Sequence, residues 1–223
     1  MKILILGDSL TFGHGVNLEN TWPYLLQKKG CWVTHRGRGG STIIKVLEEL
    51  NEIEDWSKKK RKNNNFYPFD ICIIQAGIVD STPRPFSRNI SFLLSKMYIT
   101  NLILLKLGKS RFFLRYFGKP WISENIFLKN LKLLKKKVNN FAKKTIYLEI
   151  AMPAHHLIDN CGNFSERVKK YNKILKENND KKFLFLPIYG DQLSDKYILK
   201  DGYHLNQSGH NLIFKNIIKR INI

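Results

Sequence analysis

The sequence has few cysteines, and their positions exclude several classes of protein. Its three cysteines, Cys31, Cys72 and Cys161, are odd in number and show no metal-ligand spacing. This pattern argues against a disulfide framework and against a structural zinc site, and it is typical of a reducing compartment. We therefore expect no metal and no cofactor.

Long apolar runs are also missing. The first apolar segment, Lys2–Leu6, is shorter than the core of a signal peptide, so the sequence predicts a cytoplasmic protein. The longest apolar region, residues 86–125, is interrupted by Lys96, Asn101 and Lys106, which argues against a membrane-spanning helix.

Acidic residues are a minority of the charged side chains. The chain has 18 Asp and Glu against 38 Lys and Arg, for a formal net charge of +20. Such an excess favours anionic partners: nucleic acid, an anionic membrane surface, or an anionic substrate such as an acidic sugar. The basic residues are scattered and form no recognised nucleic-acid module, so specific nucleic-acid binding is the least favoured. The oligomeric state stays open.

The 223 residues, 43% of them hydrophobic, are enough for one well-filled core, so we expect a single domain over residues 1–223. Apolar segments predict five buried strands: Lys2–Leu6, Cys31–Thr34, Asp70–Gln75, Thr145–Ile150 and Phe183–Pro187. Helical patterns between and after them cover Thr21–Lys29, Thr42–Trp56, Phe164–Asn178 and Gln207–Ile221. This alternation predicts a three-layer α/β/α fold with a five-stranded parallel sheet of doubly wound type.

A long apolar and basic insertion, residues 86–125, follows the third predicted strand. Three interpretations are open: a helical lid or partner-docking helix, helices that extend the core, or a surface that contacts an anionic membrane. In the first interpretation, Ser91–Lys106 is helical and lies near the Ser9 edge of the sheet or in a subunit contact.

The turn after the first strand is Gly7-Asp8-Ser9. Parallel sheets bind ligands at the carboxyl ends of their strands, where Ser9 is expected, and the backbone N–H groups that follow can face a developing anion. For this tripeptide alone, the simpler interpretation is a tight turn in which Ser9 caps a helix.

A second motif, Asp201-Gly202-Tyr203-His204, precedes the last predicted helix. A histidine three residues after an aspartate can turn its ring toward a serine while the aspartate accepts its Nδ1 proton. Ser9, His204 and Asp201 would then be nucleophile, base and orienting acid. The other histidines have no such context, although His155 and His156 follow the fourth strand and could line a pocket.

Together these blocks resemble the GDSL or SGNH superfamily of hydrolases and acyltransferases, over nearly the whole chain. The first block is Gly7–Gly13, the last is Asp201–His204, and Gly39-Gly40-Ser41-Thr42 is similar to the family's second block. The resemblance implies Ser9 as nucleophile, His204 as general base and Asp201 as its orienting carboxylate. It also implies the N–H groups of Ser9 and Gly40 as oxyanion donors, and a flavodoxin-like sheet.

One block departs from the family pattern. Where the family has Gly-x-Asn-Asp, this chain has Gly77-Ile78-Val79-Asp80, and Val79 cannot donate a hydrogen bond. Losing one oxyanion donor typically costs a hundred- to a thousandfold in rate. Arg84 either supplies the missing donor or is an exposed surface arginine. Asp80 and Arg84 are our candidates for substrate binding.

The sequence leaves two functions of different class. The favoured one is a serine esterase or O-acyltransferase that acts through an acyl-enzyme. Gly-Ile-Val-Asp followed by Pro-Arg resembles a subgroup associated with bacterial surface-polysaccharide gene clusters, which suggests a small-molecule or glycan acyl ester as substrate. The alternative is a weak or inactive protein that binds glycans or anions on the same fold, motivated by Val79 and the net charge.

Overall fold

The computed structural model describes residues 1–60, 69–87, 90–91, 118–160, 163–190 and 195–222, together with residues 106, 110, 112, 114 and 116. Its main sheet has five parallel strands in the order β2-β1-β3-β6-β7. The strands are β1 (Lys2–Gly7), β2 (Trp32–Gly37), β3 (Phe69–Gln75), β6 (Ala142–Leu148) and β7 (Phe183–Leu186). This confirms the predicted flavodoxin-like sheet.

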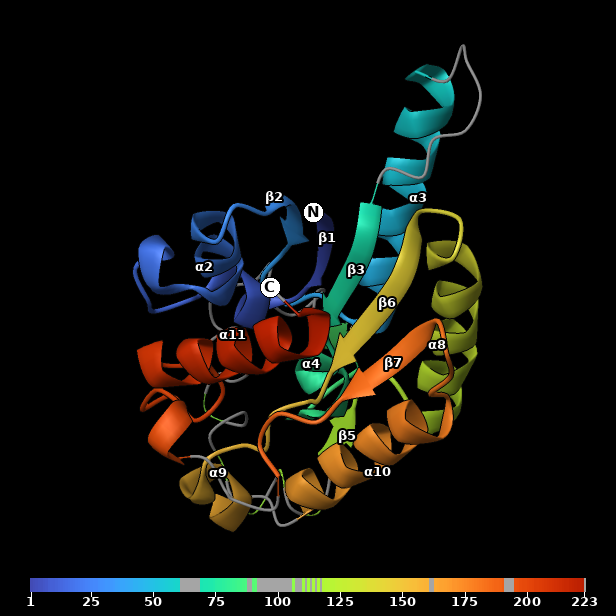
Figure 1. Cartoon of the computed structure of the whole chain (residues 1–223). Coiled ribbons are helices and arrows are strands. Elements are labelled where there is room, and N and C mark those ends of the chain that lie inside the picture. Colours follow the sequence, from blue (N-terminus) through green and yellow to red (C-terminus); the bar gives the residue numbers. More distant parts are fainter. Residues whose placement is uncertain are drawn as a thin grey trace.

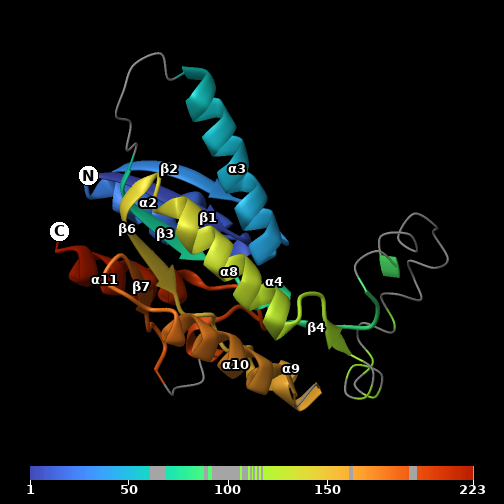
Figure 2. The same cartoon turned by 90° about the vertical axis from the view of Figure 1, so that its right-hand side faces the viewer.

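Helices cover both faces of the sheet (Figures 1 and 2). On one face α2 (Trp22–Lys28) packs against α11 (Gln207–Ile221), and on the other α3 (Ile43–Lys60) and α10 (Asn163–Glu177) each contact α8 (Glu124–Val138). The described residues also form short helical segments: α1 (Ser9–Phe12), α4 (Ile78–Ser81), α9 (His155–Asn160), and 3₁₀ turns at Leu18–Asn20 and Asp195–Tyr197. The molecule is thus the predicted α/β/α sandwich.

The central strand β1 is buried on both faces. Ile3, Leu4, Ile5 and Leu6 have no exposed surface, as expected of a parallel strand between two helical layers. Each such side chain contributes about 1.5–3 kcal/mol by leaving water. The carboxyl end of β1, where Ser9 begins α1, is therefore fixed to a fully buried strand.

The largest errors in the predicted strand bounds are at the end of β2 and the start of β6; β6 also ends at Leu148 rather than Ile150, and the other errors are of one residue. β2 does not end at Thr34 but continues to Gly37, because its pairing with β1 extends to Gly7 opposite Gly37. β6 begins at Ala142, opposite Phe69 of β3, rather than at Thr145. In both cases pairing with a neighbouring strand extends the strand into residues whose polar or glycine character resembled a loop.

A two-stranded antiparallel ribbon, absent from the predictions, closes the base of the insertion. β4 (Pro83–Arg84) pairs with β5 (Lys119–Pro120), with Arg84 opposite Lys119. In Figure 2 this ribbon lies beyond α4 and the amino-terminal end of α8. Most of the predicted helix Ser91–Lys106 lies outside the described residues, and so do residues 61–68 of the basic segment before β3.

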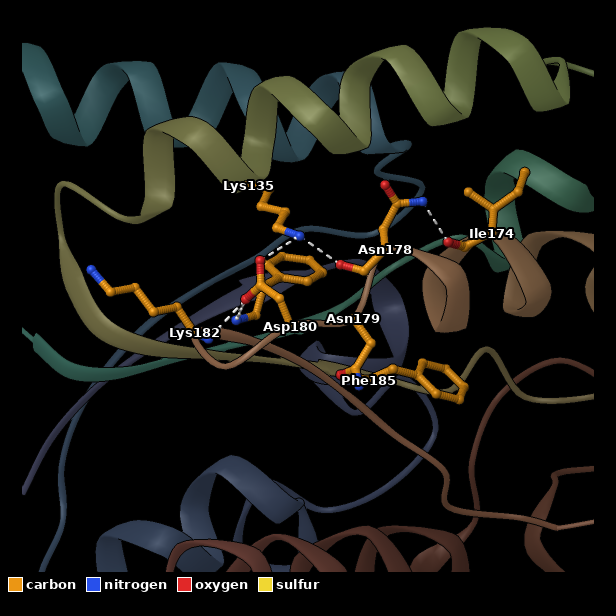
Figure 3. Close-up of polar contacts among 8 residues, drawn as sticks. Lys135, Ile174, Asn178, Asn179, Asp180, Lys182 and Phe185 are labelled. Atoms are coloured by element: carbon orange, nitrogen blue, oxygen red, sulfur yellow. Dashed lines mark hydrogen bonds and ion pairs between the residues drawn. The ribbon is translucent and has the colours of Figure 1, made fainter.

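The outer strand β7 is closed off by the turn that precedes it (Figure 3). The N–H of Phe183 donates to Asp180 Oδ1 at 2.7 Å, and that of Phe185 donates to Asn179 Oδ1 at 2.8 Å. Lys135 of α8 holds the turn by an ion pair with Asp180 at 2.7 Å. Side chains thus occupy edge N–H groups that another strand would otherwise use.

Candidate active site

Ser9 is placed by the sharp turn between β1 and α1. Asp8 caps α1, and its Oδ1 accepts from the Leu10 N–H at 2.9 Å. Gly7 is required here, because a Cβ at this position would lie 2.3 Å from the Gln75 carbonyl oxygen. The turn leaves the Ser9 hydroxyl at the carboxyl edge of the sheet, where the sequence predicted it.

His204 and Asp201 come from the loop before α11. His204 Nε2 lies 2.9 Å from Ser9 Oγ, and His204 Nδ1 lies 2.6 Å from Asp201 Oδ2. The structure therefore brings together three side chains from opposite ends of the chain, separated by up to 195 positions. With Asp201 accepting from Nδ1, the Nε2 atom is free to accept the Ser9 hydroxyl proton.

The Asp201 carboxylate is set in its own loop. Its Oδ1 accepts from the N–H groups of Tyr203 at 2.9 Å and His204 at 3.0 Å. Burial opposes ionisation, but these two hydrogen bonds and the His204 ring together lower the pKa of Asp201 below its ordinary value. The group is therefore a carboxylate at neutral pH, as an orienting partner for histidine must be.

Beside these residues lies a pocket of about 290 Å³. It is lined by Ser9, Gly40, Ile78, Val79, Thr82, Arg84, Tyr203 and His204. Gly40 has a φ of +72°, a left-handed conformation that favours glycine. Within the described part of the chain, the N–H groups of Ser9 and Gly40 have no hydrogen-bond acceptor. Both are thus available to a ligand oxygen in the pocket.

Val79 and Thr82 form the side of the pocket where the family pattern has an asparagine. Val79 is an apolar wall residue of α4. The Thr82 hydroxyl donates to the carbonyl of Ile78 at 2.5 Å, so its proton is already used. Neither side chain supplies a donor in place of the missing amide.

Asp80 does not line the pocket. It is fully buried, and its two carboxylate oxygens lie 3.0 and 3.2 Å from the Ile43 N–H at the start of α3. Instead of facing a substrate, it ties α4 to the segment that carries Gly40. Burial raises the pKa of Asp80 to about 7, and it raises the pKa of the equally buried Asp8 to about 8.

Arg84, the other substrate-binding candidate, is a partly buried wall residue of the pocket rather than an exposed one. Its guanidinium lies over the Trp121 ring, 4.8 Å from the centroid. Trp121 is held in turn by a hydrogen bond from its indole N–H to the Phe86 carbonyl at 3.1 Å. Sequence reasoning assigned no role to Trp121 or Tyr203. Tyr203 was noted only as part of the Asp201–His204 motif, and only the folded ribbon brings Trp121 to Arg84.

The remaining histidines take different places. The His14 ring lies 4.5 Å from the His204 ring, so it borders the site. His155 pairs with Asp195 at 2.9 Å, and neither His155 nor His156 lines the pocket. His210 is fully buried and accepts from the Trp22 N–H at 3.4 Å.

Within the described ranges, no three His, Cys or acidic side chains are close enough to hold a metal ion. Across the same ranges, no helix is long and apolar enough to cross a membrane.

Solved structures with the same fold are numerous. The crystal structure of TesA superposes with a TM-score of 0.61 at 15% identity, covering 98% of this chain and 97% of that one. The psychrotrophic esterase EstA from Pseudoalteromonas sp. gives 0.56 at 18%, covering 99% and 96%. A lipase/acylhydrolase from Enterococcus faecalis gives 0.59 at 18%, covering 99% and 94%. No curated protein matches.

The arrangement of a serine, a histidine and an aspartate at the carboxyl edge of a flavodoxin-like sheet defines a class of hydrolases. The family model of the GDSL-like lipase/acylhydrolases matches residues 5–212, and the chain belongs to this family. Family membership supports a hydrolase.

Proposed function

We propose that this chain is a serine esterase or O-acyltransferase that forms an acyl-enzyme on Ser9. The observation that carries the proposal is the unbroken set of contacts from Ser9 Oγ through the His204 ring to Asp201, on the wall of a pocket of about 290 Å³. A pocket of this size suits a short acyl group or one end of a larger ester.

Each group has a defined role in the proposed reaction. As Ser9 Oγ attacks the ester carbonyl, its proton passes to His204 Nε2, and Asp201 holds the imidazolium that results. The negative charge on the carbonyl oxygen is met by the N–H groups of Ser9 and Gly40. His204 then gives its proton to the departing alcohol. In the second half, His204 deprotonates water or an acceptor hydroxyl, which attacks the acyl-enzyme. His204 then returns this proton to Ser9 Oγ as the acid or the new ester leaves.

For the substrate, we propose an acyl ester of a carbohydrate or glycan precursor, acted on in the cytoplasm. The resemblance of Gly77–Asp80 and Arg84 to the polysaccharide-associated subgroup supports this substrate class. Hydrolysis and transfer differ in the species that attacks the acyl-enzyme. Product analysis with a methyl glycoside as added acceptor separates them, since transfer yields an acylated glycoside and hydrolysis yields free acid.

A second candidate is a weak or inactive binding protein on the same fold, favoured by the hydrocarbon side chain of Val79. The geometry of Ser9, His204 and Asp201 favours the enzyme, because binding alone does not require a serine hydroxyl 2.9 Å from an imidazole that is itself oriented by a carboxylate.

Kinetics with 4-nitrophenyl acetate test the choice. Ser9→Ala and His204→Ala should each lower kcat by about a thousandfold or more, and Asp201→Asn should lower it less than His204→Ala does. His155→Ala is the matched control, since this exposed histidine also pairs with an aspartate but lies outside the pocket. Turnover that survives Ser9→Ala unchanged would rule out the acyl-enzyme on Ser9, and a native chain that shows no turnover at all would favour the binding protein.

A further inference from the structure

Arg84 places a positive charge on the wall of the pocket that holds Ser9 and His204. It stands in β4, whose pairing with β5 fixes its backbone, and its guanidinium is stacked on Trp121. An arginine held in this way is pre-organised, because the ring and the ribbon remove much of the freedom that the side chain has in water.

Within the described part of the chain, this charge has no acidic partner. Among the described residues, no carboxylate forms an ion pair with Arg84, and its buried Nε has no hydrogen-bond acceptor. Burial lowers the pKa of the Arg84 guanidinium, and Tyr203, which lines the same pocket, opposes this shift. Of the 18 acidic residues in the sequence, Asp191 alone falls outside the described residues, and residues 86–118 contain none.

A partly buried guanidinium without a counter-ion has lost water and gained no compensating charge. The compensation that the pocket allows is an anionic group on the ligand itself. Arginine is well suited to this task, because its planar fork binds a carboxylate or a phosphate through two parallel hydrogen bonds.

We infer that the ester attacked by Ser9 carries a negative charge, and that Arg84 and Tyr203 bind this anionic group inside the pocket. The inference rests on the proposed function and goes beyond it, because it specifies the charge of the substrate. The charge resides either on the acyl chain or on the alcohol, and the shared chemistry is a carboxylate or phosphate close to the scissile carbonyl.

Binding of a ligand anion by Arg84 and donation to the oxyanion would have different kinetic consequences when Arg84 is replaced. A donor to the tetrahedral intermediate lowers the barrier for charged and neutral esters alike, so its loss reduces kcat for both. A residue that binds a ligand anion discriminates between them, so its loss reduces the ratio of the two kcat/KM values.

Two matched pairs of esters measure that ratio. For charge on the acyl chain, 4-nitrophenyl hydrogen adipate is compared with its methyl ester; for charge on the alcohol, 4-acetoxybenzoate is compared with methyl 4-acetoxybenzoate. We expect the anionic member of one pair to be preferred, and Arg84→Met to lower that preference by about ten- to a hundredfold, the value of a charge-assisted hydrogen bond. Arg84→Lys should retain part of it.

Arg220→Gln is the control for net charge. It removes the same charge from an exposed position in the last turn of α11, outside the pocket, and should leave the preference unchanged. Three results would overturn the inference. The first is the absence of a preference in both pairs of esters. The second is an equal fall in kcat/KM for charged and neutral esters in Arg84→Met, and the third is an equal loss of preference in Arg220→Gln. The proposed function would survive each of these results.

If the native chain turns over none of the four esters faster than Ser9→Ala does, the proposed function fails. The anion site is then tested by a binding experiment without turnover. Calorimetry on Ser9→Ala with adipate and with 4-hydroxybenzoate should detect binding of one of them that is lost on adding Arg84→Met. Absence of binding by both, or binding that persists without Arg84, would overturn the anion site as well.

Discussion

Hydrocarbon occupies one side of the proposed oxyanion site, because Val79 stands where the family pattern has an asparagine. Two backbone N–H groups, those of Ser9 and Gly40, are left to meet the charge of the tetrahedral intermediate. Two donors still support acyl transfer, so we expect modest turnover of small activated esters.

Val79→Asn should raise kcat, because it adds an amide donor where the family places one. A well-placed donor is worth roughly a hundredfold, and an increase of about tenfold would already indicate an incomplete oxyanion site. The measurement is kcat on 4-nitrophenyl acetate, with the melting temperature followed to detect any cost of burying the amide.

Val79→Leu is the matched control, since leucine has nearly the shape of asparagine and no donor. An equal rise in both variants would mean that pocket shape, rather than the added donor, is responsible. No rise in Val79→Asn with the fold intact would contradict the incomplete site.

Individual site residues were predictable from the sequence where a short motif encodes them. Ser9, Asp201 and His204 were identifiable because each stands in a block whose spacing has a chemical reason, and the structure brings their side chains within hydrogen-bond distance. The place of Asp80 was not predictable, because its contact with the Ile43 N–H depends on how two loops 37 positions apart fold against each other.

The outer strand β7 depends on side chains from outside the sheet. Its edge N–H groups donate to Asp180 and Asn179, in the turn that Lys135 holds (Figure 3). The strand has only four residues, which also limits pairing with another chain.

Asn179→Ala should destabilise the fold by about 1 kcal/mol, since the Phe185 N–H loses its acceptor. It should also increase self-association at high concentration, because the freed edge can pair with another strand. Urea unfolding and sedimentation velocity measure the two effects. Asn130→Ala, which removes only a bond to the Ile126 carbonyl within α8, should not change self-association. Equal association by both variants would contradict the edge-capping role.

Elements with strong periodicity were predictable, and those made by tertiary pairing were not. The last helix was predicted at its observed bounds, Gln207–Ile221, because its apolar residues repeat at helical spacing between clear ends. The ribbon of β4 and β5 has two residues per strand, too few for any periodic signal, and both strands contain a proline. Only the fold reveals that it ends at Arg84 beside the pocket.

For the molecule as a whole, the two buried carboxyls beneath the site should make stability depend on pH. Burial raises the pKa of Asp8 to about 8 and that of Asp80 to about 7, against an ordinary value of 3.8. The folded state therefore holds protons that the unfolded state has lost. The stabilisation that these bound protons contribute is complete below about pH 4 and is lost as the pH rises toward 8. Burial lowers the pKa of His210 to about 4, so its contribution falls instead as the pH drops below 6.5.

Of these three groups, only the two carboxyls differ in protonation between the folded and unfolded states from pH 6.5 to 8. The free energy of unfolding should therefore decrease as the pH rises through this range. Each carboxyl contributes at most about 1.4 kcal/mol per pH unit. Urea unfolding across this range measures the slope. Asp8→Asn keeps an acceptor for the Leu10 N–H and should flatten the slope, whereas Asp55→Asn, at an exposed position of α3, should not. A free energy that rises with pH in this range would contradict the account.

Covalent labelling tests most directly whether the fold activates Ser9 as a nucleophile. A fluorophosphonate probe should add once to this chain, on the tryptic peptide Ile3–Lys28, in which Ser9 is the sole serine. His204→Ala should label far more slowly, and Ser9→Ala should not label. A native chain that stays unlabelled, or that labels on a different peptide, would contradict the account.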